Sequence, residues 1–215
     1  RLPAEQAVGI EIPRGLFGRE EETAHRLAKA RDAGISYALC SNIGALPLAR
    51  QAGLLPVGGV GLNITNAAAV AQYADRGLKA ALVSQELTFS QMDFAWDREK
   101  TPVPMGLMVY GRQPLMVMRN CPRGGKHGCS GCGGGSVVDR KGVRFPIACG
   151  PCAELLNSAC LYWADKLPEL PREAFFYLHF TDESRERAAS VCEAYRTGGG
   201  PMEGITRGLY RRGVE

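Results

Sequence analysis

The chain has 215 residues, of which 45% are hydrophobic and 22% are charged, and its formal net charge is +4 at pH 7. This balance predicts one soluble globular domain with an adequate apolar core and excludes an intrinsically disordered chain. No apolar run reaches the roughly 18 residues that a membrane-spanning helix needs, and no signal peptide opens the sequence, so we expect a cytoplasmic protein.

Short β-rich stretches alternate with alanine-rich helical patterns through the first half of the chain. The predicted strands are residues 8–12, 35–39, 57–62, 80–84 and 105–110. The predicted helices are residues 20–33, 45–52 and 66–76, and a glycine follows each of them. Helices between successive strands favour parallel pairing through right-handed crossovers, which makes the fold class α/β. The spacing fits a (βα) barrel, although a doubly wound sheet could show it too.

A complete barrel needs eight strand–helix units and about 250 residues. Four to five units precede the cysteines, so we interpret residues 1–112 as the later part of a TIM-like barrel. The opening Arg1 and the linker-like RLPAEQA indicate a fragment of a longer chain, which would supply the missing strands.

Functional groups of a barrel follow its strands, at the carboxyl end of the sheet. For this chain the rule selects Arg14, Ser41, Asn42, Asn63, Glu86 and Arg112. Ordinary polar caps on strand-to-helix turns are an equally good interpretation of any one of them.

Residues 113–152 form a cysteine-rich segment that we predict to bind metal, because it holds five of the eight cysteines. Thiols stay reduced in the cytoplasm, which favours metal binding or redox chemistry over disulfides. Cys129, Cys132, Cys149 and Cys152 have the C-x2-C-x16-C-x2-C spacing of a tetrahedral zinc site. The quartet in which Cys121 replaces Cys152 equally suits a cubane iron–sulfur cluster. Spacing alone does not choose between the two metals.

The remaining three cysteines lie outside that segment. We predict that Cys40, Cys160 and Cys192 are buried small hydrophobes, Cys40 at the end of a strand and the other two on apolar helical stretches.

Positive charge is concentrated around the clustered thiols, where seven Lys and Arg side chains accompany one Asp in residues 112–152. These cations could lower the pKa of the thiols and hold them as thiolates. They could also attract phosphates, or form an ordinary solvated loop.

Several motifs together resemble bacterial proteins known as collagenase-like peptidases, peptidase family U-thirty-two. They are GLNITN at 61–66, SQELT at 84–88, YGRQPLMVMRNCP at 110–122, DRKGVRFPIAC at 139–149, ELLNS at 154–158 and TRGLYRRGV at 206–214. The resemblance spans nearly the whole chain. It is strongest to the C-terminal portion of the large members that are related to the ribosomal RNA hydroxylation protein.

The resemblance implies a barrel that carries a four-cysteine [4Fe–4S] cluster and takes part in hydroxylating RNA bases or ubiquinone precursors, in some cases with prephenate. Matched by motif, the resemblance implies that the ligands are Cys121, Cys129, Cys132 and Cys149. Cys152 is then an additional cysteine that is not a ligand. Many relatives have Arg where this chain has Gln85, so only Glu86 of that strand end is carried over.

The peptidase name itself has little chemical support in these residues. The chain has three histidines, no H-E-x-x-H motif and no G-x-S-x-G motif. His179, in the aromatic stretch FFYLHF, is interpreted as a core histidine.

We therefore predict an iron–sulfur enzyme that hydroxylates a base in structured RNA. Arg112, Arg119, Arg140 and Lys141 would bind phosphate or a small anionic metabolite such as prephenate. Glu86 and Asn63 are the catalytic candidates. Residues 153–215 are expected to add a helix, a strand and a second helix to the same domain. The alternatives are a collagenase-like peptidase and a non-enzymatic zinc module that binds RNA or protein; neither DNA nor a membrane is an expected partner.

Overall fold

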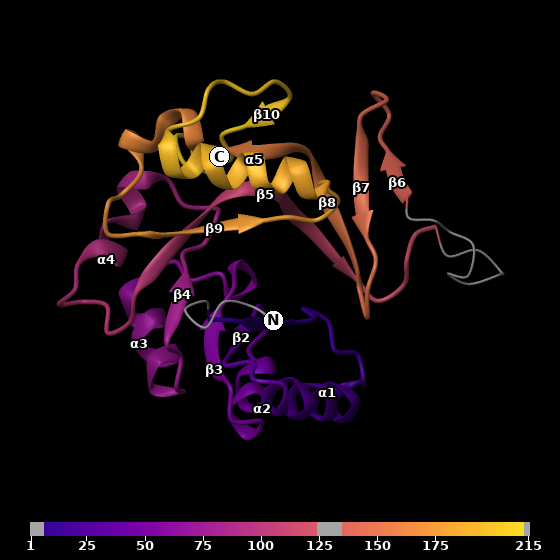
Figure 1. Cartoon of the computed structure of the whole chain (residues 1–215), viewed down its shortest axis with the longest axis vertical. Coiled ribbons are helices and arrows are strands. Elements are labelled where there is room, and N and C mark those ends of the chain that lie inside the picture. Colours follow the sequence, from indigo (N-terminus) through magenta and orange to yellow (C-terminus); the bar gives the residue numbers. More distant parts are fainter. Residues whose placement is uncertain (1–6, 124–134, 213–215) are drawn as a thin grey trace.

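A curled, open sheet of parallel strands forms the centre of the fold (Figure 1). The computed structural model describes residues 7–123 and 135–212. The first four strands are β1 (Gly9–Ile12), β2 (Tyr37–Cys40), β3 (Leu55–Gly58) and β4 (Ala80–Leu82). They pair in parallel with β5 (Met105–Met118), which also pairs in parallel with β9 (Phe175–His179). Their spatial order follows their chain order, as in a barrel, so the predicted partial barrel is consistent with this sheet.

The connecting helices agree with the prediction and lie close to the predicted bounds. They are α1 (Glu20–Asp32), α2 (Ala45–Gln51) and α3 (Ala67–Asp75). The Asn66 side chain caps α3 by accepting a hydrogen bond from the Ala69 N–H at 2.9 Å. Gly34 and Gly77 follow α1 and α3 at φ +91° and +94°, the left-handed conformation that ends helices. A short α4 (Asp93–Trp96) precedes β5.

The second half of β5 leaves the parallel sheet and begins an antiparallel one. It pairs with β8 (Ala153–Tyr162), which pairs with β7 (Arg144–Ala148), which pairs with β6 (Gly135–Val138). Figure 1 shows the β6–β7 hairpin projecting away from the parallel strands. The predicted helix at the start of 153–215 is wrong, because residues 153–162 form β8 with ladder partners on both sides. A short apolar run fits a helix or a strand equally well until those partners are known.

The last part of the chain returns over the core. A long helix, α5 (Arg185–Thr197), is followed by β10 (Ile205–Thr206), which pairs in parallel with β8. Arg207 then donates two hydrogen bonds of 2.7 Å to the Asp165 carboxylate, and this guanidinium holds the pKa of Asp165 below its usual range. The Tyr210 side chain is fully buried, and its hydroxyl donates to the Met108 carbonyl at 2.6 Å. These contacts fasten the tail to the sheet.

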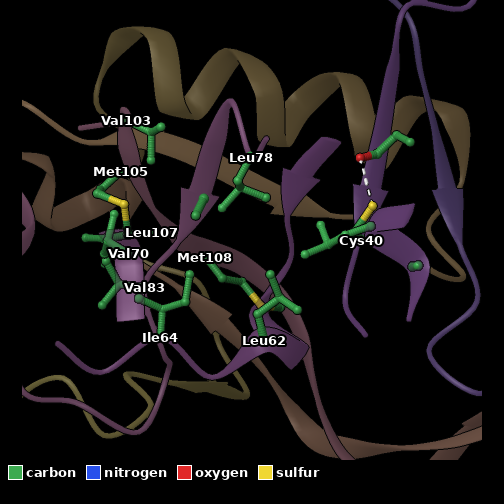
Figure 2. Close-up of a cluster of buried hydrophobic side chains, with 14 of the residues drawn as sticks. Cys40, Leu62, Ile64, Val70, Leu78, Val83, Val103, Met105, Leu107 and Met108 are labelled. Atoms are coloured by element: carbon green, nitrogen blue, oxygen red, sulfur yellow. Dashed lines mark hydrogen bonds between the residues drawn. The ribbon is translucent and has the colours of Figure 1, made fainter. Parts of the chain in front are cut away.

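The main core lies between the parallel strands and their helices (Figure 2). Cys40 is wholly buried there, and its thiol donates to the Ala38 carbonyl at 3.4 Å. Burial raises the pKa of that thiol to about 12, so the predicted core role of Cys40 is confirmed. Cys160 is half-buried on β8 rather than on a helix. Cys192 is exposed on α5, and its predicted core role is wrong. Within 7–123 and 135–212, no helix is long and apolar enough to span a bilayer.

Candidate metal centre

The sheet register brings three of the clustered cysteines to one end of β8. In the ladder, Glu154 of β8 pairs with Val117 of β5 on one side and with Ala148 of β7 on the other. Cys121 follows β5 by three residues, Cys149 follows β7 directly, and Cys152 directly precedes β8. These three cysteines, separated by up to 31 positions in sequence, therefore lie at the same edge of the sheet, which we call the thiol edge.

Accessibility differs among the thiols of this edge. Cys121 is half-buried, Cys149 is exposed and donates weakly to the Ile147 carbonyl at 4.0 Å, and Cys152 is buried. Cys129 and Cys132 lie outside the described residues. In the part of the chain that is described, no group of three or more His, Cys, Asp or Glu side chains is arranged to hold a metal ion.

The residues on either side of 124–134 also lie at the thiol edge. Arg123 comes two residues after Cys121, and Gly135 opens β6 opposite Ile147. A Cβ added to Gly135 would lie closer than 3.0 Å to the Arg123 side chain, so the two residues are in contact. Both attachment points of the intervening segment are thus beside Cys149.

A cavity of about 250 Å³ adjoins the thiol edge, and we call it the thiol hollow. It is lined mainly by Glu11, Arg14, Cys149, Cys152, Glu154 and His179. Glu11 and His179 belong to the outermost parallel strands, β1 and β9. The curl of the sheet therefore brings these two strands near the thiols, as expected for the carboxyl end of a barrel.

The ionisable groups of the thiol hollow affect one another. Burial raises the pKa of Glu154, while the Arg14 guanidinium opposes that shift and the Glu11 carboxylate adds to it. Burial in the hollow likewise raises the pKa of Glu11, and Arg14 opposes the shift. Burial lowers the pKa of His179, and the Glu154 carboxylate opposes that. The hollow thus holds two carboxylates, one imidazole and one guanidinium without a direct ion pair among them.

The catalytic candidates Asn63 and Glu86 lie elsewhere, after β3 and β4. The Ser84 hydroxyl donates to the Asn63 side-chain oxygen and accepts from the Glu86 N–H at 3.2 Å. Glu86 is exposed and lines another cavity, of about 400 Å³, with Gln85 and Gln113. The Gln113 amide donates to Gln85 at 2.8 Å. The hydrogen bonds among Asn63, Ser84 and Glu86 support the turn after β4. This is the structural role, a polar cap on a turn, that was the alternative interpretation of these strand-end residues.

The four cations predicted to bind substrate are not brought together. Arg112 donates to the backbone carbonyls of Asn157 and Ser158 and so has a structural role across the β5–β8 ladder. The guanidinium of Arg119 lies 5.9 Å from the centre of the Phe17 ring. Arg140 and Lys141 are exposed in the β6–β7 turn, at the far end of the hairpin from the thiol edge (Figure 1).

Comparison with protein-family models, curated proteins and solved structures finds no match for the chain. The resemblance to peptidase family U-thirty-two therefore rests on its motifs.

Three ionisable groups of the thiol hollow, Glu11, Glu154 and His179, were not recognised as site residues in the sequence. His179 was interpreted as a core histidine, but it is half-buried, lines the hollow and stacks on Tyr177 with ring centres 5.8 Å apart. It is the last residue of a parallel strand, so the strand-end rule could have selected it. Glu154 lies two residues after Cys152, and only the folded structure shows that it lines one cavity with Arg14 and His179.

Proposed function

We propose that this chain is part of a cytoplasmic iron–sulfur protein that hydroxylates a base in structured RNA. Cys121, Cys129, Cys132 and Cys149 would be the ligands of a [4Fe–4S] cluster. The observation that carries the proposal is the register of β5, β8 and β7, which gathers Cys121 and Cys149 at one edge. The segment with Cys129 and Cys132 begins and ends beside that edge.

The residues around the thiol edge fit such a cluster. Four thiolates are the usual ligands of such a cluster. When bound, the cluster would supply electron transfer at a potential set by the surrounding protein. Glu11, Glu154 and His179 line the adjacent hollow and can hold or move a proton there.

The substrate and partners in this proposal follow from the resemblance and from charge. Arg119, Arg140 and Lys141 form no ion pair with any described residue, so they are available to phosphate. A small anionic metabolite such as prephenate is a proposed co-substrate. Among the described residues, β1 and β9 each pair on one side only. Strands from the parent chain or from a partner would complete the barrel between them.

Two alternatives have their own support. Cys152 is buried at the same edge as Cys149, which suits a zinc site made of Cys129, Cys132, Cys149 and Cys152. A thiol peptidase would need a cysteine paired with a histidine. Cys149, Cys152 and His179 line one hollow, but no hydrogen bond between His179 and a thiol is present within the described structure.

The ligand set can be tested by replacing Cys121 and Cys152 separately with serine and measuring iron content and visible absorption under anaerobic conditions. We expect Cys121→Ser to lose the bound iron, because three thiolates cannot complete the cluster, and Cys152→Ser to retain it. Cys192→Ser is the matched control, since this thiol is exposed on α5. Loss of iron from Cys152→Ser but not from Cys121→Ser, or a chain that binds zinc and no iron, would contradict the iron–sulfur proposal.

The RNA partner can be tested through the salt dependence of binding to a short structured RNA. Each phosphate contact adds about 0.7 to 0.9 to the slope of log affinity against log salt. The double variant Arg140→Gln/Lys141→Gln should therefore lower that slope by about 1.5. Arg26→Gln/Lys29→Gln, which removes the same charge from the exposed face of α1, should leave it unchanged. A slope near zero for the unmodified chain would argue against RNA as the partner.

A further inference from the structure

A second cavity lies over the loops that follow β1, β2 and β3, and it shares Arg14 with the thiol hollow. Its volume is about 650 Å³, and we call it the mouth hollow. The residues that the argument uses are Arg14, Phe17, Glu20, Ser41, Asn42 and Gly61. No cysteine lines this cavity. It sits at the carboxyl ends of parallel strands, where barrel and open α/β folds bind ligands.

Two polar groups in the mouth hollow have no partner in the described structure. The Arg14 guanidinium forms no hydrogen bond and no ion pair there, although the side chain is half-buried. The Ser41 hydroxyl also forms no hydrogen bond, and the residue is only 6% exposed. A guanidinium offers five donors and a hydroxyl offers one. The two groups together form an unused set of hydrogen-bond donors.

The loops hold these donors in place. The Asn42 amide donates to the Arg14 carbonyl at 2.8 Å, and its side-chain oxygen accepts from the Gly44 N–H at 2.8 Å. Asn42 thus fixes the loop after β1 to the loop after β2. A Cβ added to Gly61 would lie closer than 3.0 Å to both Arg14 Nε and the Ser41 carbonyl. Glycine at this position therefore leaves the space beside the guanidinium open.

Apolar side chains form the other walls of the mouth hollow. Leu16, Leu62 and Tyr73 line it, and Phe17 lies at its rim with 43% of its surface exposed. Phe17 has a φ of 49°, a left-handed conformation that a large side chain rarely adopts. Strain of this kind is found preferentially at ligand sites, where it positions a side chain for binding.

We propose that the mouth hollow binds a small organic anion, with a carboxylate or phosphate held by Arg14 and Ser41 and an apolar body against Phe17 and Leu62. Arginine suits this role because its planar fork makes two parallel hydrogen bonds to an oxyanion. Glu20 also lines the cavity, and its carboxylate disfavours a second negative charge on the ligand. Arg14 also lines the thiol hollow, where it lowers the pKa of Glu11 and of Glu154 against the effect of burial without forming an ion pair with either. The site needs no thiol, so it does not depend on the proposed cluster.

Binding of benzoate, phenyl phosphate and the uncharged benzyl alcohol to the full chain tests this site by calorimetry or ligand-observed NMR. We expect at least one anion to bind and benzyl alcohol not to bind measurably. Tighter binding of benzoate identifies a carboxylate ligand, and tighter binding of phenyl phosphate identifies a phosphate. Arg14→Gln should lower the affinity for the preferred anion by roughly tenfold or more, and Ser41→Ala should lower it by about fivefold. Arg26→Gln on α1 should leave the affinity unchanged.

Thermal unfolding of every variant accompanies these measurements. If Arg14→Gln does not fold, the anion affinity of Ser41→Ala tests the site instead, because this change removes one buried hydroxyl without changing charge. Equal anion affinity in the folded variants and the unmodified chain would overturn the proposal. So would binding of benzyl alcohol as tightly as the anions, or no binding of either anion. Iron content measured on the same samples keeps this result separate from the fate of the cluster.

Discussion

Replacing Gly111 with alanine is expected to destabilise the chain by roughly 3 kcal/mol, the combined cost of a left-handed backbone and an overpacked contact. Gly111 has a φ of +113° and pairs with His179 in the β5–β9 ladder. An added Cβ would lie closer than 3.0 Å to the backbone oxygen and the Cβ of His179. Because β9 must move to relieve this contact, we also expect His179 to shift from the thiol hollow. Urea unfolding followed by circular dichroism measures the stability change.

Gly142→Ala is the matched control for Gly111→Ala. Gly142 has a φ of +80° in the β6–β7 turn, and a Cβ there would meet nothing within 4 Å. Its replacement should therefore lower the stability only by the cost of a left-handed backbone at alanine, about 1 kcal/mol. Equal losses in the two variants would contradict the conclusion that close packing of β9 on β5 sets the requirement for Gly111.

Tyr210→Ala is expected to destabilise the chain by about 3–5 kcal/mol, because it leaves a large cavity in the core. The ring of Tyr210 lies 5.4 Å from that of Phe89 and 6.0 Å from that of Trp163, centre to centre. Removing it would take away the main apolar contact of the tail. Unfolding in urea measures this cost, and limited proteolysis of the tail should become faster than in the unmodified chain.

Tyr210→Phe separates the ring from its hydroxyl. This change keeps the packing but deprives the Met108 carbonyl of its 2.6 Å hydrogen bond, at a cost of about 1–3 kcal/mol. A Tyr210→Ala variant no less stable than Tyr210→Phe would mean that the tail is held by its ion pairs rather than by Tyr210. Those pairs, Arg207–Asp165 and Arg211–Glu169, are partly exposed, so we expect them to contribute less.

The parallel units were predictable because their signals are local. An apolar stretch, a capping residue such as Asn66 and a terminal glycine such as Gly77 lie within about 20 residues of one another, and each indicates the same element. The antiparallel sheet has no such local signal. Residues 153–162 become a strand because β5 and β7 pair with them from both sides, and neither contact can be inferred from the composition of the segment.

The candidate site was predictable to the extent that it follows from strand ends. That rule selected Arg14, Ser41 and Asn42, which line the mouth hollow. The thiols were found by spacing, but their common edge depends on Glu154 pairing with both Val117 and Ala148. His179 joins Arg14 and Glu154 only because the sheet curls. Pairing and curvature of this kind arise from tertiary contacts between distant segments, so no local pattern in the sequence reports them.

The length of β5 has a mechanical consequence. Its 14 residues run from the buried part of the parallel sheet toward the thiol edge. Met105–Tyr110 are buried, whereas Leu115 and Met116 are more than half exposed. The inner half pairs with β4 and β9, whereas the outer half pairs with β8 alone before the chain reaches Cys121. A displacement of the outer half of β5 would therefore be transmitted along the backbone of β5 to the parallel strands whose loops form the mouth hollow.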